Sequence, residues 1–151
     1  MVLSSAEINT AQNRGKIKIA GYSSGCLTMN AYRLRVGNTI ERYTNDQAAF
    51  DAIHLDDGPP IIEDIGAQYV LVPGAVYIIH ARETSVSGSL DAFLSSTKSA
   101  AKCGLQVIGS CMAISGELKI AVSVVQPIII QPDQFFAQLQ FHKDCDHTMT
   151  L

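Results

Sequence analysis

A run of hydroxyl and lysine side chains in the second half of the chain could bind a phosphate group. Lys98, Ser99 and Lys102 follow the helix-capping candidates Ser95-Ser96-Thr97, and Gly104 marks the end of the short helix predicted here. Free N–H groups at the start of a helix attract phosphate oxygens, and the two lysines add positive charge. The same pattern also fits a solvated, capped helix without a ligand, so both interpretations stay open.

A second group of reactive side chains lies near the end of the chain. His142, Cys145 and His147 have the spacing H-x2-C-x-H, and acidic residues lie between them. This spacing matches no standard structural zinc site and no fourth ligand is evident, so we expect a polar tail and no bound metal. His80 is expected to be a hydrogen-bonded residue of a strand, and the chain contains no nucleophile-elbow motif.

Composition narrows the class of protein and its partners. The 151 residues are 47% hydrophobic and 17% charged, which excludes a disordered chain. The net charge of -3 argues against a nucleic-acid partner, because phosphate-driven affinity needs a basic surface. No apolar stretch reaches the roughly 18 residues of a membrane span, and the N-terminus lacks the pattern of a signal peptide. We therefore expect a cytoplasmic protein with no membrane partner.

The hydrophobic pattern predicts many short strands and one short helix. Apolar residues alternate with polar ones in several segments, and Pro and Gly residues separate these segments. The expected fold is therefore mostly β, a barrel or sandwich with one short helix. The predicted strands are residues 16–20, 26–37, 69–72, 76–80, 118–125, 128–130 and 135–142.

Five segments resemble, in the same order, the motifs of the dCTP deaminase and dUTPase superfamily. The resemblance implies a distorted β-barrel or jelly-roll subunit of the dUTPase type. It also implies a homotrimer with nucleotide sites at the subunit interfaces. The segments are AYRLRVGN at 31–38, LVPG with YIIHARE at 71–83, LDAFL at 90–94, STKSAAKCGL at 96–105 and PIIIQPDQFFAQL at 127–139.

This resemblance divides the chain into three parts. Residues 16–142 form the dUTPase-like β domain. Residues 1–15 are expected to be a flexible N-terminal arm, and residues 143–151 a polar C-terminal tail.

The resemblance also indicates that the acidic catalytic positions have changed. Ala121 stands where the deaminases have a glutamate that moves protons, and Ser115 stands where dUTPases have an aspartate that orients water. A methyl group cannot exchange a proton, so we expect no general acid–base catalysis at Ala121. Arg33 replaces the aspartate of the first motif and inverts its charge.

The remaining site predictions also follow from the resemblance. Lys102 replaces an arginine of the phosphate-binding segment. The preceding Arg-Ser pair is replaced by Thr97-Lys98 or, with a one-residue shift, by Lys98-Ser99. Gln138, singled out instead because it is polar within a predicted strand, is a candidate for contact with a neighbouring subunit or a ligand. Inter-strand pairing with solvent exposure is the alternative explanation. The candidate base-pocket residues are Val107, Gly109, Ser110 and Ala113.

We therefore expect a trimeric, catalytically degenerate protein that binds a pyrimidine nucleotide or acts in regulation or assembly. One alternative is an active deaminase or diphosphatase whose acid is relocated to Glu83, Asp91 or a partner subunit. Such an enzyme would use Mg²⁺ bound to the nucleotide phosphates. Another alternative is a structural jelly-roll protein without a ligand.

Overall fold

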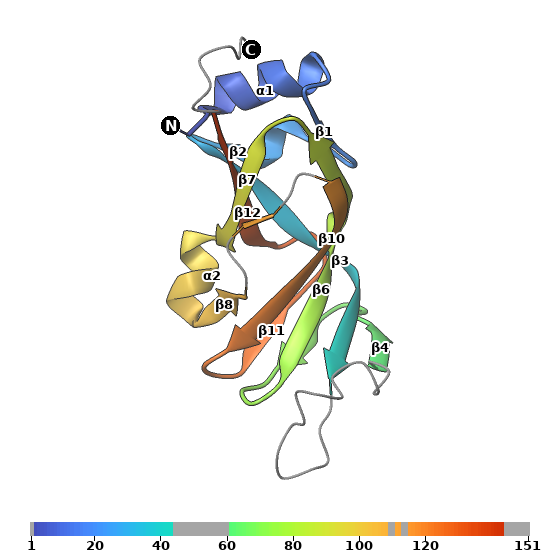
Figure 1. The fold of residues 1–151 in the computed structure, drawn as a ribbon. Helices are drawn as coiled ribbons and strands as arrows, with labels where there is room; N and C mark the ends of the chain where they lie inside the picture. The colour runs from blue at the N-terminus through green and yellow to red at the C-terminus, as the bar shows by residue number, and fades with distance from the viewer. Residues whose placement is uncertain (1, 44–60, 109–110, 113–114, 144–151) are drawn as a thin grey trace, which may run out of the picture.

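The computed structural model describes residues 2–43, 61–108, 111–112 and 115–143. Most of these residues lie in β-strands, as predicted (Figure 1). The helices are α1 (Ser5–Asn13), α2 (Lys98–Cys103) and the short 3-10 helix η1 (Ser24–Cys26). The strands are β1 (Ile17–Ile19), β2 (Leu27–Thr28), β3 (Ala31–Tyr43), β4 (Ile61–Asp64), β5 (Tyr69–Leu71), β6 (Val76–Gly88), β7 (Asp91–Ser96), β8 (Leu105–Val107), β9 (Cys111–Met112), β10 (Ser115–Val124), β11 (Ile128–Ile130) and β12 (Phe135–His142).

The main sheet curves into a nearly closed barrel. Its strands follow the order β8-β10-β6-β3-β12-β7-β9, while β5 and β11 form a separate pair. The Ser96 hydroxyl donates to the Leu105 carbonyl at 3.1 Å and accepts from the Val107 amide at 3.0 Å. Ser96 thereby links β7, near one end of this order, to β8 at the other end. The prediction of a mostly β, barrel-like fold is confirmed.

The hydrophobic core fills the space inside this curved sheet. Every second residue of a strand points inward and contributes its side chain to this core. In β6, Tyr77, Ile79 and Ala81 are buried, while their neighbours point outward. The alternation fails in β12, where Phe136 and Ala137 are both buried. The pairing with β3 shifts register between Phe135 and Ala137, so a β-bulge turns Phe135 outward instead.

A helix occupies most of the region where the sequence predicts a flexible arm. That prediction is wrong for Ser5–Asn13, which form α1 at one end of the barrel (Figure 1). Ser4 and Glu7 form a reciprocal capping box, with their hydrogen bonds at 3.1 and 3.2 Å. Ile8 and Ala11 are fully buried. Ile8 and Ala11 therefore anchor this otherwise polar segment in the core.

The predicted helix after Thr97 is confirmed as α2. The Thr97 hydroxyl caps it by accepting from the Ala100 amide at 3.2 Å. Gly104 ends it with φ +94°, a conformation that favours glycine. Within the described ranges, no helix is long and apolar enough to cross a bilayer.

Candidate functional site

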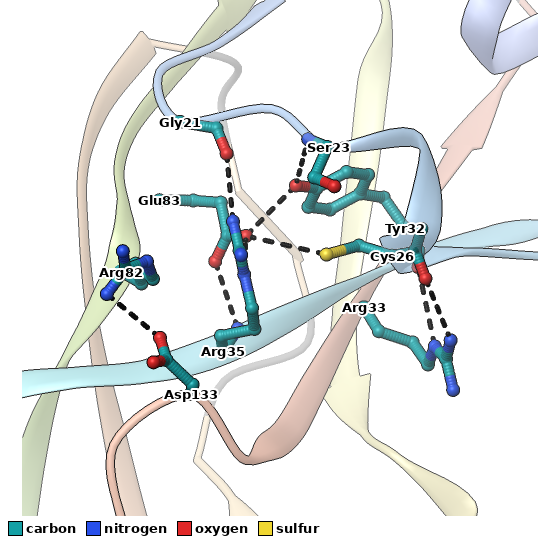
Figure 2. Close-up of polar contacts among 10 residues, drawn as sticks. Gly21, Ser23, Cys26, Tyr32, Arg33, Arg35, Arg82, Glu83 and Asp133 are labelled. Carbon is teal, nitrogen blue, oxygen red and sulfur yellow. Dashed lines mark hydrogen bonds and ion pairs between the residues drawn. The ribbon is translucent and has the colours of Figure 1, made fainter.

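A fully buried carboxylate stands at the centre of a polar cluster in the barrel wall. Glu83 of β6 has no exposed surface. Its Oε2 atom accepts from Arg35 Nε at 2.8 Å and from the Tyr32 hydroxyl at 2.9 Å, while Oε1 accepts from the Arg35 amide at 2.9 Å (Figure 2). The Cys26 thiol lies 4.0 Å from Oε2. Both carboxylate oxygens are therefore occupied by protein donors.

The same cluster fastens the segment between β1 and β2 to the barrel. The Tyr32 hydroxyl accepts from the Ser23 amide at 3.1 Å, and Arg35 Nη2 donates to the Gly21 carbonyl at 2.9 Å (Figure 2). Burial, together with the neighbouring Glu83 carboxylate, raises the pKa of the Tyr32 hydroxyl above its ordinary value. Tyr32 therefore stays a neutral donor to Glu83.

Neither acid considered as a relocated catalyst is well placed for that role. A general acid must reach the substrate, and Glu83 is enclosed by protein. Asp91 is exposed at the start of β7, where it pairs across the sheet with His142. It lies five positions before Ser96, a distance of roughly 17 Å along an extended strand. Asp91 therefore lies far along β7 from the phosphate-binding segment.

The position that the resemblance assigns to the proton-moving glutamate lies in the middle of β10. Ala121 is half-buried, pairs with Ile78 of β6, and accepts from the Ile108 amide at 2.8 Å through its carbonyl. Two acids share this face of the sheet. Glu41 of β3 also pairs with Ile78, and Glu117 lies four residues earlier in β10, with its carboxylate 3.0 Å from Lys119 Nζ. Ser115 begins β10 opposite Ser87.

The predicted phosphate-binding residues lie together on the exposed side of α2. Lys98, Ser99 and Lys102 are all exposed, and the two lysines share one helix face because they are four residues apart. Thr97 is buried, and its hydroxyl caps the helix. Thr97 is therefore not available to a ligand, and Lys98 carries the positive charge at the start of the segment under either alignment.

An open cavity of about 540 Å³ adjoins this helix. It is lined by Leu94, Ser95 and Ser96 of β7, by Ala101 of α2 and by Leu105, Gln106 and Val107 of β8. Of the predicted base-pocket residues, Val107 lines this cavity. Gly109, Ser110 and Ala113 lie outside the described residues. The hollow combines apolar walls with hydroxyl and amide groups, as small-molecule sites do.

Comparison with known proteins places this barrel in a family. The sequence model described as dCTP deaminase-like matches residues 2–143. The chain belongs to the dCTP deaminase-like family. None of the curated proteins matches it.

Solved structures agree on the fold of this dCTP deaminase-like chain. One of them is the 2'-deoxycytidine 5'-triphosphate deaminase from Agrobacterium tumefaciens, with a TM-score of 0.69 and 17% identity. The match covers 93% of this chain and 47% of that one, so the chain spans about half the length of the solved protein. At this identity the likeness establishes the fold alone.

Two further predicted residues of the dCTP deaminase-like chain lie on the outer face of the barrel. Gln138 pairs across the sheet with Arg33 of β3 on one side and with Ser95 of β7 on the other. The Arg33 guanidinium lies 3.9 Å from the centre of the Phe135 ring. Ser95, the cross-strand neighbour of Gln138, is the member of this group that lines the cavity.

Metal-ligating side chains do not gather anywhere in the described residues. No group of three or more His, Cys, Asp or Glu side chains there could hold an ion. His142 lies at the end of β12, where its ring is 4.4 Å from that of Phe93. Cys145 and His147, the other members of the predicted tail cluster, lie outside the described residues.

Sequence reasoning missed the Glu83 cluster, although one signal was present. Glu83 has the same strand parity as Tyr77, Ile79 and Ala81, so alternation already places its carboxylate on the buried face. A buried carboxylate needs charged and hydrogen-bonding partners. Alternation in β3 does not identify Arg35 as that partner. Alternation predicts only where side chains point, whereas Arg35 binds Glu83 through its backbone amide as well as its side chain.

Proposed function

We propose that this protein binds a pyrimidine nucleotide and does not deaminate or hydrolyse it. The observation that carries this proposal is the half-buried Ala121 in β10, at the position where the resemblance expects a proton-moving glutamate. Glu83 and Asp91 do not compensate, because one is enclosed and the other lies far along β7. General acid–base catalysis requires a proton carrier within hydrogen-bonding reach of the substrate.

Binding rests on the side chains around the cavity. Lys98 and Lys102 supply charge for phosphate oxygens, although a lysine lacks the two-pronged geometry of arginine. Ser95 and Gln106 offer hydrogen bonds beside the apolar wall, which suits a pyrimidine ring. The net charge of -3 favours a local anion site over a general polyanion surface.

The proposal includes assembly and location. The resemblance implies a homotrimer with its nucleotide sites at subunit interfaces, and we propose this arrangement in the cytoplasm. A binding protein of this kind would sense or sequester nucleotides instead of converting them. Its output would then be regulation or assembly.

Two measurements test the proposal. Incubation of the protein with dCTP and dUTP in Mg²⁺, followed by chromatography, is expected to yield no product. Thermal shift with the same nucleotides is expected to raise the melting temperature, because a ligand that prefers the native state stabilises it. The double variant Lys98→Ala/Lys102→Ala is expected to lose this shift.

A matched control separates local binding from general charge. Lys18 is an exposed lysine of β1, and Lys18→Ala should keep the full shift. Nucleotide turnover by the wild-type protein would contradict the proposal that it neither deaminates nor hydrolyses its ligand. A melting temperature indifferent to every nucleotide would contradict the binding proposal.

A further inference from the structure

We propose that Arg33, Gln138 and Ser95 form an anion-binding row that takes a phosphate group of the ligand directly, without a divalent cation. The inference rests on the proposed function, because it assumes that the ligand carries phosphates. It adds a second cationic contact, on the sheet, to the lysines of α2.

Arg33 differs from the other arginines of β3 and of the neighbouring β6 because it has no carboxylate partner among the described residues. Within the part of the chain that the structure describes, its guanidinium makes no ion pair. The other arginines of β3 and β6 each lie within 2.9 Å of an acid: Arg35 of Glu83, Arg42 of Glu63 and Arg82 of Asp133. Arg33 therefore carries a charge that the described residues leave unneutralised.

The guanidinium is nevertheless held in place. It stacks over the Phe135 ring at 3.9 Å, and its Nε and Nη2 atoms donate to the carbonyls of Cys26 at 3.4 Å and Gly25 at 3.3 Å. Nη1 makes no hydrogen bond to any described residue. A guanidinium has five N–H donors, so a fixed fork with free donors remains. Such preorganisation favours anion binding because little side-chain freedom is lost.

Two more polar side chains continue this site across the sheet. Gln138 pairs with both Arg33 and Ser95, and residues opposite each other in antiparallel strands project to the same face. The next residue, Leu139, is fully buried, so Gln138 points away from the core. Neither the Gln138 amide nor the Ser95 hydroxyl bonds to another described residue. The strands on either side of β12, which are β3 and β7, lie about 10 Å apart. This distance is close to the length of a phosphate chain.

The row leads to the cavity. Ser95 lines the open hollow of about 540 Å³ beside α2. A ligand seated there can meet the row on one side and the exposed Lys98 and Lys102 on the other. Arg33 would then approach the phosphates from β3 while the lysines approach them from α2.

The charge of Arg33 explains why no metal is needed. Where an aspartate stands in the first motif, a phosphate is repelled unless a cation lies between the two anions. Arginine attracts the phosphate itself and can bind two of its oxygens. Replacement of the acid by Arg33 therefore converts a cation-attracting position into an anion-attracting one.

Titration calorimetry of the full chain tests this inference, with dCTP and inorganic tripolyphosphate as probes. Binding is expected to persist in EDTA. Arg33→Gln should weaken it by about tenfold or more, and Gln138→Ala less. Arg82→Ala, which removes an exposed ion pair, is the matched control and should bind like the wild-type protein. Urea unfolding of each variant confirms that it is folded.

An NMR readout isolates Arg33 from any structural role. The Nε signal of Arg33, assigned by its loss in Arg33→Gln, should shift saturably with tripolyphosphate in EDTA. An unchanged affinity in Arg33→Gln, or binding only with Mg²⁺, would overturn the inference while leaving nucleotide binding in place. If Arg33→Gln or Gln138→Ala lowers the oligomer mass measured by light scattering but keeps the affinity for dCTP and tripolyphosphate, the inference is also overturned. These residues would then belong to a contact between subunits. Failure of the wild-type protein to bind dCTP would instead refute the proposed function.

Discussion

Arg35 binds Glu83 through its backbone and its side chain at once, with the amide 2.9 Å from Oε1 and Nε 2.8 Å from Oε2. The pairing of β3 with β6 reaches Val36 and Ala81 at this end. The Glu83 carboxylate therefore accepts from a strand amide just beyond the last paired residues. The hydrogen bond from the Arg35 amide to the carboxylate takes the place of a backbone–backbone hydrogen bond between the strands. It is charge-assisted, and it keeps β3 and β6 together where their backbone pairing ends.

Replacement of Glu83 by alanine should destabilise the protein strongly. The change leaves the Arg35 guanidinium and the Tyr32 hydroxyl without their acceptor in a buried site. Breaking a buried pair by removing one partner costs about 3–5 kcal/mol. Urea unfolding followed by circular dichroism measures the loss. Glu117→Ala removes an exposed pair with Lys119 and should leave the midpoint nearly unchanged. Equal stability of the two variants would contradict the proposed role of the cluster.

Alkaline pH should weaken the fold through Tyr69. Burial, followed by its hydrogen bond to Glu63, raises the pKa of the Tyr69 hydroxyl to about 12. Since an unfolded tyrosine titrates near pH 10, the folded state holds this proton more tightly. The contribution to stability is therefore complete below about pH 10 and is lost as the pH rises through about 12.

Unfolding free energies across this alkaline range, with tyrosinate absorbance, measure the effect. Tyr69→Phe should flatten the decline of stability with pH. Glu63→Gln should lower the pKa of Tyr69 toward its ordinary value, because it removes the second cause of the shift. A decline of the same steepness in Tyr69→Phe would assign the alkaline loss to other groups.

Most of the barrel follows from local sequence patterns. The helix after Thr97 and its end at Gly104 are set by capping chemistry within a few residues. Alternation correctly places Ile17 and Ile19 inward in β1. In β12 it fails at Phe135, because the bulge depends on how β3 pairs with that strand. Local patterns carry no information about such long-range pairing.

The site is harder to predict than the fold for the same reason. The Arg33–Gln138–Ser95 row joins three strands that lie far apart in the chain, so no spacing reveals it. Helix α1 was missed although Ser4 and Glu7 form a capping box. Its apolar stripe is narrow, and the core of the barrel supplies the packing that makes it a helix.

Gly37 should tolerate no side chain. It is buried in β3 where the pairing with β6 shifts register, and a Cβ atom there would lie 2.5 Å from the His80 carbonyl oxygen. The obstacle is backbone, so it cannot turn aside, and overpacking costs about 1–3 kcal/mol or more. Gly25→Ala is the matched control, because its nearest atom would be the Ser23 Oγ at 3.7 Å. Chemical denaturation should separate the two variants, and equal midpoints would contradict the close approach of β3 and β6.

Helix α1 should behave as part of the core. Ile8 is fully buried, and the neighbouring Leu3 amide donates to the Phe141 carbonyl at 2.8 Å, which joins the start of the chain to β12. Ile8→Ala should therefore cost about 2–5 kcal/mol, as for other buried aliphatic truncations. Asn13→Ala changes an exposed residue of the same helix and should have little effect.

The acid side gives an independent check on the same helix. A hydrogen bond from Lys143 and the backbone of Ser4 lower the pKa of Glu7 below its ordinary value. A lowered folded pKa means that the stabilisation is present above the ordinary value near 4.5 and is lost as the pH falls through the folded one. The protection factors of the Ser5–Asn13 amides, which compare the observed exchange rate with the intrinsic rate at the same pH, should therefore fall on acidification in the wild-type protein. In Glu7→Gln, protection should already be lower at neutral pH and depend less on acid. Protection in α1 that is unchanged by both pH and this substitution would show that the capping box and the Lys143 pair do not hold the helix.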